Sequence, residues 1–110
     1  MGRATRTMFR SPFGILEEPL MMWTILAIDK EPDENIRHYT DKTGGRNNTV
    51  FARIQELIDM DLVTYERGEF NSKFLRLTAD GERLAKTLKR LLRQYRGIVN
   101  ARGEGGDEAQ

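Results

Sequence analysis

A long amphipathic helix near the C-terminus constrains the fold most strongly. Apolar side chains recur there at spacings of 4, 3, 4 and 3 residues, a pattern that lets one helix bury a narrow seam against another. We predict a helix over 79–99, which at roughly 1.5 Å per residue outreaches so small a domain. Closure of the seam over the chain's own domain is the alternative. We expect a homodimer whose interface comprises Leu84, Leu88, Leu91, Leu92, Tyr95 and Ile98.

Two shorter helices are predicted in the first half of the chain. Pro19 stands at the first turn of a segment that is apolar almost all round over 20–28, so a helix is predicted to begin there and to need cover on several sides. Asp33 is predicted to cap a short second helix that reaches Tyr39. The segment 40–46, which contains two adjacent glycines, is predicted to be a turn.

A third helix is predicted over 48–60, with Asn47 or Asn48 as its cap. Its inward stripe consists of Val50, Ile54, Leu57 and Ile58, which repeat at helical spacing. The opposite face is therefore left to contact something outside the domain. That face holds Asn48, Thr49, Ala52 and Glu56, with Arg53 on its flank.

A β-hairpin is predicted to follow the third helix. Two strand-like runs, 62–66 and 74–77, flank a loop that contains a glycine, so the tip of the hairpin is expected to project. Thr78 supplies a side-chain oxygen that can cap the long helix, and Gly81 lets another backbone approach closely.

Composition limits the kinds of protein that fit this order of elements. The 110 residues include no cysteine, which excludes disulfides, thiolate metal sites and thiol catalysis. No apolar run is long enough to span a membrane and no secretory signal is recognisable, so we expect a cytoplasmic protein without membrane contact. We expect one domain over 17–100, a basic N-terminal arm over 1–16 and a disordered tail over 101–110.

Charge is balanced in sum but unevenly placed. The chain has 18 basic and 17 acidic side chains, and the acids concentrate in 17–34 and in the tail. The bases gather at the N-terminus, in 35–56 and in 82–100. A basic block of this kind is either a surface for phosphates or the solvated face of an amphipathic helix.

Two runs of residues on either side of the hairpin carry a family resemblance. They are Val50, Ile54, Leu57, Ile58, Asp61, Leu62 and Val63, then Leu77, Thr78, Ala79, Asp80, Gly81 and Leu84. With these runs, the order of elements resembles a winged helix-turn-helix and is most similar to the MarR/PadR-type transcription regulators of bacteria and archaea. The similarity is densest over 35–92. In that family a similar apolar run ends the recognition helix and enters the wing, and many members have glycine where Asp61 stands. The resemblance implies a mainly α fold with a small β-hairpin (α+β).

The resemblance also implies a function: a dimeric, sequence-specific regulator of transcription that binds double-stranded DNA without a cofactor. The third helix would enter the major groove, and the wing, 66–73, would reach the adjacent backbone or minor groove. Arg46, Asn47, Asn48, Thr49 and Arg53 are the predicted groove residues, Lys42 and Thr43 the predicted backbone contacts, and Arg67 and Lys73 the predicted wing contacts. The residues indicate no particular small-molecule effector.

Other interpretations are weighed against this one. A metal site can be drawn from His38, Glu34 and Asp41, but a surface histidine is the simpler interpretation, because transition-metal sites need three or four good ligands. Near-neutral charge, Glu56 on the presumed reading face and Phe70 near the wing tip favour a winged-helix module that binds another protein. Phe70 can either enter a DNA groove or pack against the base of the hairpin. No catalytic constellation can be assembled, so we expect no enzyme.

Overall fold

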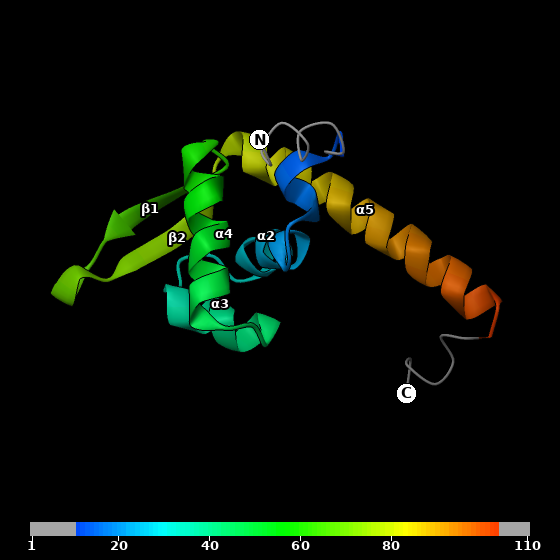
Figure 1. Ribbon diagram of the computed structural model, residues 1–110, viewed down its shortest axis with the longest axis horizontal. Coiled ribbons are helices and arrows are strands. Elements are labelled where there is room, and N and C mark those ends of the chain that lie inside the picture. Colours follow the sequence, from blue (N-terminus) through cyan, green and yellow to red (C-terminus); the bar gives the residue numbers. More distant parts are fainter. Residues whose placement is uncertain (1–10, 104–110) are drawn as a thin grey trace, which may run out of the picture.

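Helices and one hairpin follow each other in the predicted order in the computed structural model, which describes residues 11–103 (Figure 1). The α+β class is confirmed. Two short elements were not predicted: a 3-10 helix at the end of the predicted basic arm, and a second one within the loop of the hairpin. The predicted arm and tail otherwise lie mostly outside the described residues. The elements are η1 Gly14–Glu17, α2 Met21–Lys30, α3 Ile36–Thr43, α4 Asn47–Asp59, β1 Val63–Arg67, η2 Glu69–Asn71, β2 Lys73–Leu77 and α5 Ala79–Ala101.

Helix α2 lies at the centre of the domain, where it contacts α3, α4, α5 and β2. This position explains its nearly continuous apolar sequence, because several faces receive cover. Met22 and Trp23 nevertheless stay exposed. The hairpin and the C-terminal part of α5 extend from opposite sides of the domain (Figure 1). The buried apolar core consists of Met21, Ile25, Ile28, Tyr39, Val50, Ile54, Leu57, Val63, Leu75, Leu77, Ala85 and Leu88.

The predicted starts of the first three helices were wrong in detail. Helix α2 begins at Met21, because Leu20 takes a left-handed conformation (φ 67°) and leaves Pro19 in the preceding turn. Asp33 does not cap α3, since its carboxylate accepts from Arg76 Nη2 at 2.7 Å and its N–H donates to the Leu75 carbonyl at 2.7 Å. Asn35 is the cap of α3 instead, and its side-chain oxygen accepts from the His38 N–H at 3.0 Å. Helix α3 therefore continues to Thr43, past the predicted end at Tyr39.

Helix α4 follows a turn in which Gly44 takes a left-handed conformation (φ 72°). Its N-cap is Arg46, and no side chain there accepts a hydrogen bond, so neither Asn47 nor Asn48 acts as the predicted cap. The predicted inward stripe is confirmed, because Val50, Ile54 and Leu57 are fully buried and Ile58 packs against the core. The side chains of both asparagines are therefore not used as caps.

The junction between hairpin and α5 agrees with the prediction. The strands pair antiparallel, with Val63 opposite Leu77 and Arg67 opposite Lys73. The Thr78 hydroxyl accepts from the Gly81 N–H at 3.1 Å and caps α5. Gly81 packs against the chain that enters β1, and a Cβ on it would lie 2.1 Å from the Leu62 carbonyl oxygen. The Leu62 backbone therefore leaves no room for a side chain at position 81.

The residue that ends the α4 turn has a conformation typical of glycine. Asp61 has φ 61°, in the left-handed region that L side chains rarely adopt, and its N–H donates to the Ile58 carbonyl at 2.9 Å. Asp and Asn tolerate this region better than other residues with a side chain. This position of the turn thus has a conformational reason to favour glycine, and aspartate also satisfies it.

Tyr39 ties the loop after α2 to α3. Its side chain is fully buried, its hydroxyl donates to the Glu31 carbonyl at 2.7 Å, and the Glu34 N–H donates to it at 3.2 Å. Burial, which disfavours the charged phenolate, raises the pKa of Tyr39 to about 12, and the nearby carboxylates of Glu34, Asp33 and Glu31 act in the same direction.

A loss of stability in alkali is expected from this shift. The folded-state pKa of Tyr39 is raised above its ordinary value of 10.0, so the stability that the neutral phenol contributes is complete below pH 10 and is lost as the pH rises towards 12. The loss is on the order of 2 kcal/mol. Unfolding free energies of the wild type and of Tyr39→Phe should therefore converge between these pH values. A wild-type profile parallel to that of Tyr39→Phe would contradict the assignment.

Candidate nucleic-acid interface

The exposed N-terminal part of α4 forms the centre of the candidate interface. Arg46, Asn47 and Asn48 are exposed and Thr49 is half-buried, as expected for residues that face outward. Phe51, on the same side of the helix, is 47% exposed. Free N–H groups at a helix start favour anions, and amide side chains can bond base edges. This surface therefore offers both a phosphate contact and groups that can distinguish bases.

Four cations surround this surface without a carboxylate partner in the part of the chain that the structure describes. They come from α3, from the cap of α4 and from the two strands of the hairpin, and they are Arg37, Arg46, Arg67 and Lys73. Lys73 Nζ lies 4.8 Å from the centre of the Tyr65 ring, and the Arg67 guanidinium carbon lies 5.9 Å from it. Tyr65 thus holds both wing cations together on one face of the hairpin.

A shallow hollow joins α3, α4 and the wing. It is lined by Asn35, Ile36, Arg37, Phe51, Ser72 and Lys73 and has a volume of about 330 Å³. Two apolar side chains, Ile36 and Phe51, line it together with an arginine and a lysine. The predicted wing contact Lys73 is therefore brought together with the reading face of α4, and both lie beside Arg37, which the sequence did not single out.

The predicted backbone contacts at the end of α3 are already engaged. Lys42 Nζ lies 3.2 Å from the Glu31 carboxylate, which His38 Nε2 also contacts. Hydrogen bonds from His38 and Lys42 hold the pKa of Glu31 below its usual range. The Thr43 hydroxyl donates to the Thr40 carbonyl at 3.4 Å and accepts from the Gly45 N–H at 3.3 Å. Both residues stabilise the turn before α4, and a contact with phosphate would compete with these bonds.

Arg53 does not lie on the exposed face, contrary to the prediction. It is only 9% exposed, and its Nη1 lies 3.3 Å from the Pro19 carbonyl and 3.4 Å from Glu18. Its Nη2 donates to Glu56 at 3.2 Å, and its Nε forms an ion pair with Glu56 at 2.9 Å without the alignment of a hydrogen bond. The arginine thus holds α4 against the turn that precedes α2. It also neutralises Glu56, the carboxylate on the presumed reading face.

Arg53→Ala is expected to lower the free energy of unfolding by about 1–3 kcal/mol, because it leaves the Glu56 carboxylate and the Pro19 carbonyl without their donor. DNA affinity per folded molecule should change little. Urea denaturation and a binding titration of the same sample separate the two effects. Arg46→Ala is the matched control, with the opposite pattern expected. Unchanged stability with lost binding in Arg53→Ala would restore the groove assignment.

The apolar seam of α5 divides between two roles. Leu88 belongs to the core, and Leu84 and Leu92 are half-buried, so these predicted interface residues mostly pack on their own domain. The remaining three are unpartnered within residues 11–103. Leu91, Tyr95 and Ile98 are 54%, 60% and 54% exposed. Helical spacing explains the division, because Gly81, Ala85 and Leu88 form the buried stripe beside the exposed one.

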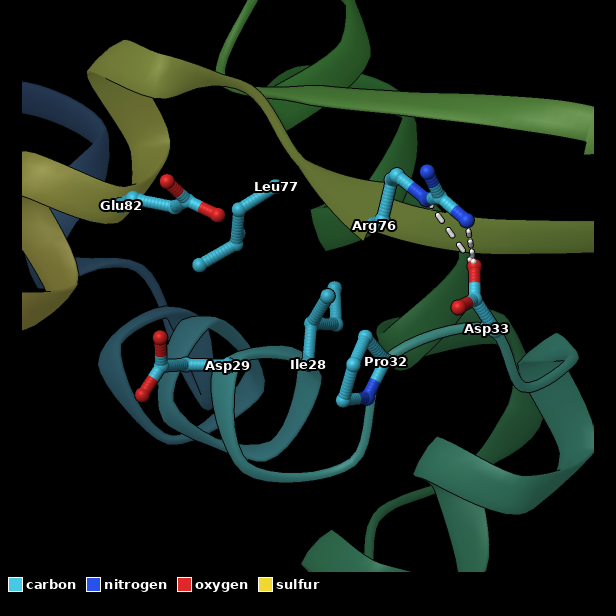
Figure 2. Close-up of a pocket in the computed structure, with 7 residues that line it drawn as sticks. All are labelled: Ile28, Asp29, Pro32, Asp33, Arg76, Leu77 and Glu82. Atoms are coloured by element: carbon cyan, nitrogen blue, oxygen red, sulfur yellow. Dashed lines mark hydrogen bonds and ion pairs between the residues drawn. The ribbon is translucent and has the colours of Figure 1, made fainter.

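A second hollow, of about 280 Å³, lies between α2, β2 and the start of α5. Figure 2 shows the Arg76–Asp33 pair at one end and Asp29 and Glu82 at the other. The Asp33 carboxylate accepts from Arg76 Nη2 at 2.7 Å, and that bond raises the pKa of Arg76. Asp29 pairs with Lys89 at 2.9 Å. With three carboxylates among its lining residues, this hollow does not suit a nucleic acid.

Two residues of the interface, Arg37 and Phe51, were missed by sequence reasoning. Phe51 follows the inward Val50 directly, and in a helix the next residue turns away from a stripe of this kind. Helical spacing alone therefore places Phe51 outside the inward stripe. Arg37 had no comparable signal, since only the folded hairpin brings the wing next to it.

Metal clusters and membrane-spanning helices were also sought among the described residues. Between residues 11 and 103 no group of three or more histidine, cysteine, aspartate or glutamate side chains is placed to hold a metal ion. Each helix in that range is too short or too polar to cross a bilayer. Neither finding adds a second candidate to the surface around α4.

Comparison with known proteins identifies the fold. No family model and no curated protein matches the chain. Among solved structures, Streptococcus pneumoniae FabT in complex with DNA matches with a TM-score of 0.64 and 20% identity over 78% of this chain. A MarR transcriptional regulator from Methanosarcina mazei matches with a TM-score of 0.67 and 22% identity over 74% of this chain. The chain spans 66% and 60% of the lengths of these two proteins.

A third structure agrees in length as well. A possible HxlR family transcriptional factor from Thermoplasma volcanium matches with a TM-score of 0.70 and 23% identity, over 84% of both chains. The fold is therefore the winged helix-turn-helix of the MarR-like regulators, as the sequence resemblance implied. In that fold α3 and α4 form the helix-turn-helix and the β1–β2 hairpin forms the wing.

Proposed function

We propose that this winged-helix protein is a dimeric, sequence-specific DNA-binding regulator of transcription, with α4 in the major groove and the wing on the adjacent backbone or minor groove. One observation carries the proposal: four cations without carboxylate partners among the described residues surround the exposed start of α4. Each cation placed on a phosphate releases condensed counterions and so contributes to affinity. The near-zero net charge is no obstacle, because the sign of the contacting face decides.

Base recognition is assigned to the first turns of α4. Neither Asn47 nor Asn48 caps the helix with its side chain, so both amides are available for adenine edges. Arg46 is exposed beside them and can bond guanine or phosphate. Phe51, which lines the hollow, suits the methyl group of thymine. Arg37, Arg67 and Lys73 then hold the backbone on either side of the groove.

The dimer is proposed to form through the exposed seam of α5. The helix has 23 residues, which correspond to about 34 Å, and its C-terminal part extends beyond the rest of the domain (Figure 1). Leu91, Tyr95 and Ile98 are each more than half exposed there. A second copy of the same helix offers a self-complementary partner for such a stripe. The wing extends on the opposite side of the domain, so dimer formation leaves the interface around α4 free.

The rival function is a module that docks another protein. The exposed Phe51 and Phe70 favour it, because aromatic side chains dominate many protein interfaces. The unpartnered cations favour DNA, since they can bind phosphates on either side of the groove while the apolar residues between them contact the bases. The rival predicts no retention of DNA at low salt.

Selection of bound duplexes from a random pool tests the proposal. We expect a two-fold symmetric consensus whose half-sites lie about 10 base pairs apart, or a multiple of this spacing. Asn48→Ala should relax the consensus at one position per half-site, whereas Arg67→Ala should weaken binding without changing the consensus. A pool that shows no enrichment at low salt would overturn DNA recognition and favour the protein-binding module.

A further inference from the structure

Phe70 stands at the tip of the wing with its side chain in solvent. It is 95% exposed and has φ 60° and ψ 33°, a left-handed conformation that is a genuine outlier for a bulky residue. The expected alternative, packing against the base of the hairpin, does not occur. Phe74 fills that place, since a Cβ on Gly68 would lie 2.1 Å from the Phe74 ring. An exposed ring on a strained backbone has no role in the stability of the isolated domain.

The tip is firmly attached despite its exposure. The Gly68 N–H donates to the Ser72 carbonyl at 2.8 Å, and the Ser72 N–H donates to the Glu69 carbonyl at 3.1 Å. These bonds close the loop on both sides of Phe70, and contact between Gly68 and the Phe74 ring supports it from the strands. The backbone therefore holds the phenyl ring out in front of the hairpin.

Two cations lie at the base of the loop that carries the ring. Arg67 and Lys73 form the last strand pair before the loop, and Tyr65 holds both at cation–π distance. Glu69, which is also exposed, is the opposing charge within the loop. An apolar tip with a basic pair at its base is the arrangement of a side chain that enters between bases while phosphates are held on either side.

We propose that Phe70 is a wedge that inserts between two adjacent base pairs in the minor groove, unstacks them and kinks the duplex. The inference rests on the proposed function and extends it, because it predicts that the protein deforms its site. Apolar wedges of this type bend DNA by roughly 20–90°. Sequence preference then extends to the step under the wing, since pyrimidine–purine steps unstack most readily.

Two substitutions distinguish the effect of the phenyl ring from the effect of the backbone conformation at position 70. Phe70→Asn retains a residue that tolerates the left-handed conformation but removes the apolar ring. Phe70→Leu retains an apolar side chain that can still wedge. The test uses the full-length protein and a duplex selected by the wild type, with dyes at its ends to report bending and 2-aminopurine at each step under the wing to report unstacking.

With the wild type we expect a bent duplex and increased 2-aminopurine fluorescence at one step per half-site. Phe70→Asn should lose both signals and bind about five- to tenfold more weakly, whereas Phe70→Leu should retain most of the bend. A Phe70→Asn complex that is as bent and as tight as the wild-type complex would overturn the wedge. So would a Phe70→Asn variant that loses binding to a protein partner but binds and bends DNA as the wild type does. If the proposed function fails, the wild type retains no duplex at all, and the wedge falls with it.

Discussion

Replacement of Leu91 and Ile98 together by glutamate is expected to convert the protein to a monomer and to weaken binding to a site with two half-sites by about 100-fold or more. The exposed stripe of α5 would then carry two carboxylates in each copy of the chain. Dimer formation would bury these unpaired carboxylates, which is costly. Each monomer still has its own α4 and wing, but the gain from binding two linked half-sites is lost.

The choice of positions matters in this experiment. Leu88 lies in the core, so a glutamate there would unfold the domain and give a false positive. Leu91 and Ile98 are each 54% exposed and lie outside the core cluster, so circular dichroism should remain that of the wild type. Arg93→Gln with Arg96→Gln is the matched control, because it lowers the net charge equally on exposed residues of the same helix. If sedimentation gives the glutamate variant the same mass as the wild type, the exposed stripe of α5 is not the dimer interface.

Gly81→Ala is expected to destabilise the domain by about 3 kcal/mol or more, a large part of the 5–15 kcal/mol that is typical of a domain. The added Cβ would lie 2.1 Å from the Leu62 carbonyl oxygen and 3.1 Å from its carbon. That carbonyl cannot move freely, since it accepts from the Thr78 N–H at 3.0 Å. The start of α5 must therefore shift away from the hairpin, and the cap at Thr78 is disturbed with it.

Gly97→Ala provides the matched control in the same helix. A Cβ there meets nothing within 4 Å, so the substitution only raises helix propensity and should stabilise by about 0.5–1 kcal/mol. Urea denaturation followed by circular dichroism compares the two variants with the wild type. Equal midpoints for Gly81→Ala and Gly97→Ala would show that the close approach at Leu62 is absent.

Periodicity predicted the elements because each buries one stripe in a single core. The stripe of α4 and the cap at Thr78 were correct for this reason, since both depend on local spacing. The helix starts were less predictable. Leu20, Asp33 and Asp61 adopt left-handed conformations, which leucine rarely adopts and which aspartate tolerates without requiring them. Their conformations are fixed by distant partners, for example the bond from the Asp33 N–H to the Leu75 carbonyl.

The candidate site was only partly predictable because ion pairing depends on tertiary structure. Arg53 and Lys42 looked as available as Arg46 in the sequence. Folding brings Glu18 from the acidic segment to Arg53, and Glu31 to Lys42, so both cations are engaged inside the domain. Arg46 has no such partner within residues 11–103. The acidic segment 17–34 therefore selects which cations remain available for a ligand.

The salt dependence of DNA binding tests the central claim most directly. A dimer that places Arg37, Arg46, Arg67 and Lys73 of both copies on phosphates should give a slope of log affinity against log salt on the order of −7. Anisotropy titrations of the selected duplex should show this slope for the wild type and for Arg93→Gln with Arg96→Gln. Replacement of the four cations by alanine should reduce the slope to near zero and abolish specific binding. A quadruple variant that retains the wild-type slope would contradict the claim that this face of α4 and the wing binds DNA.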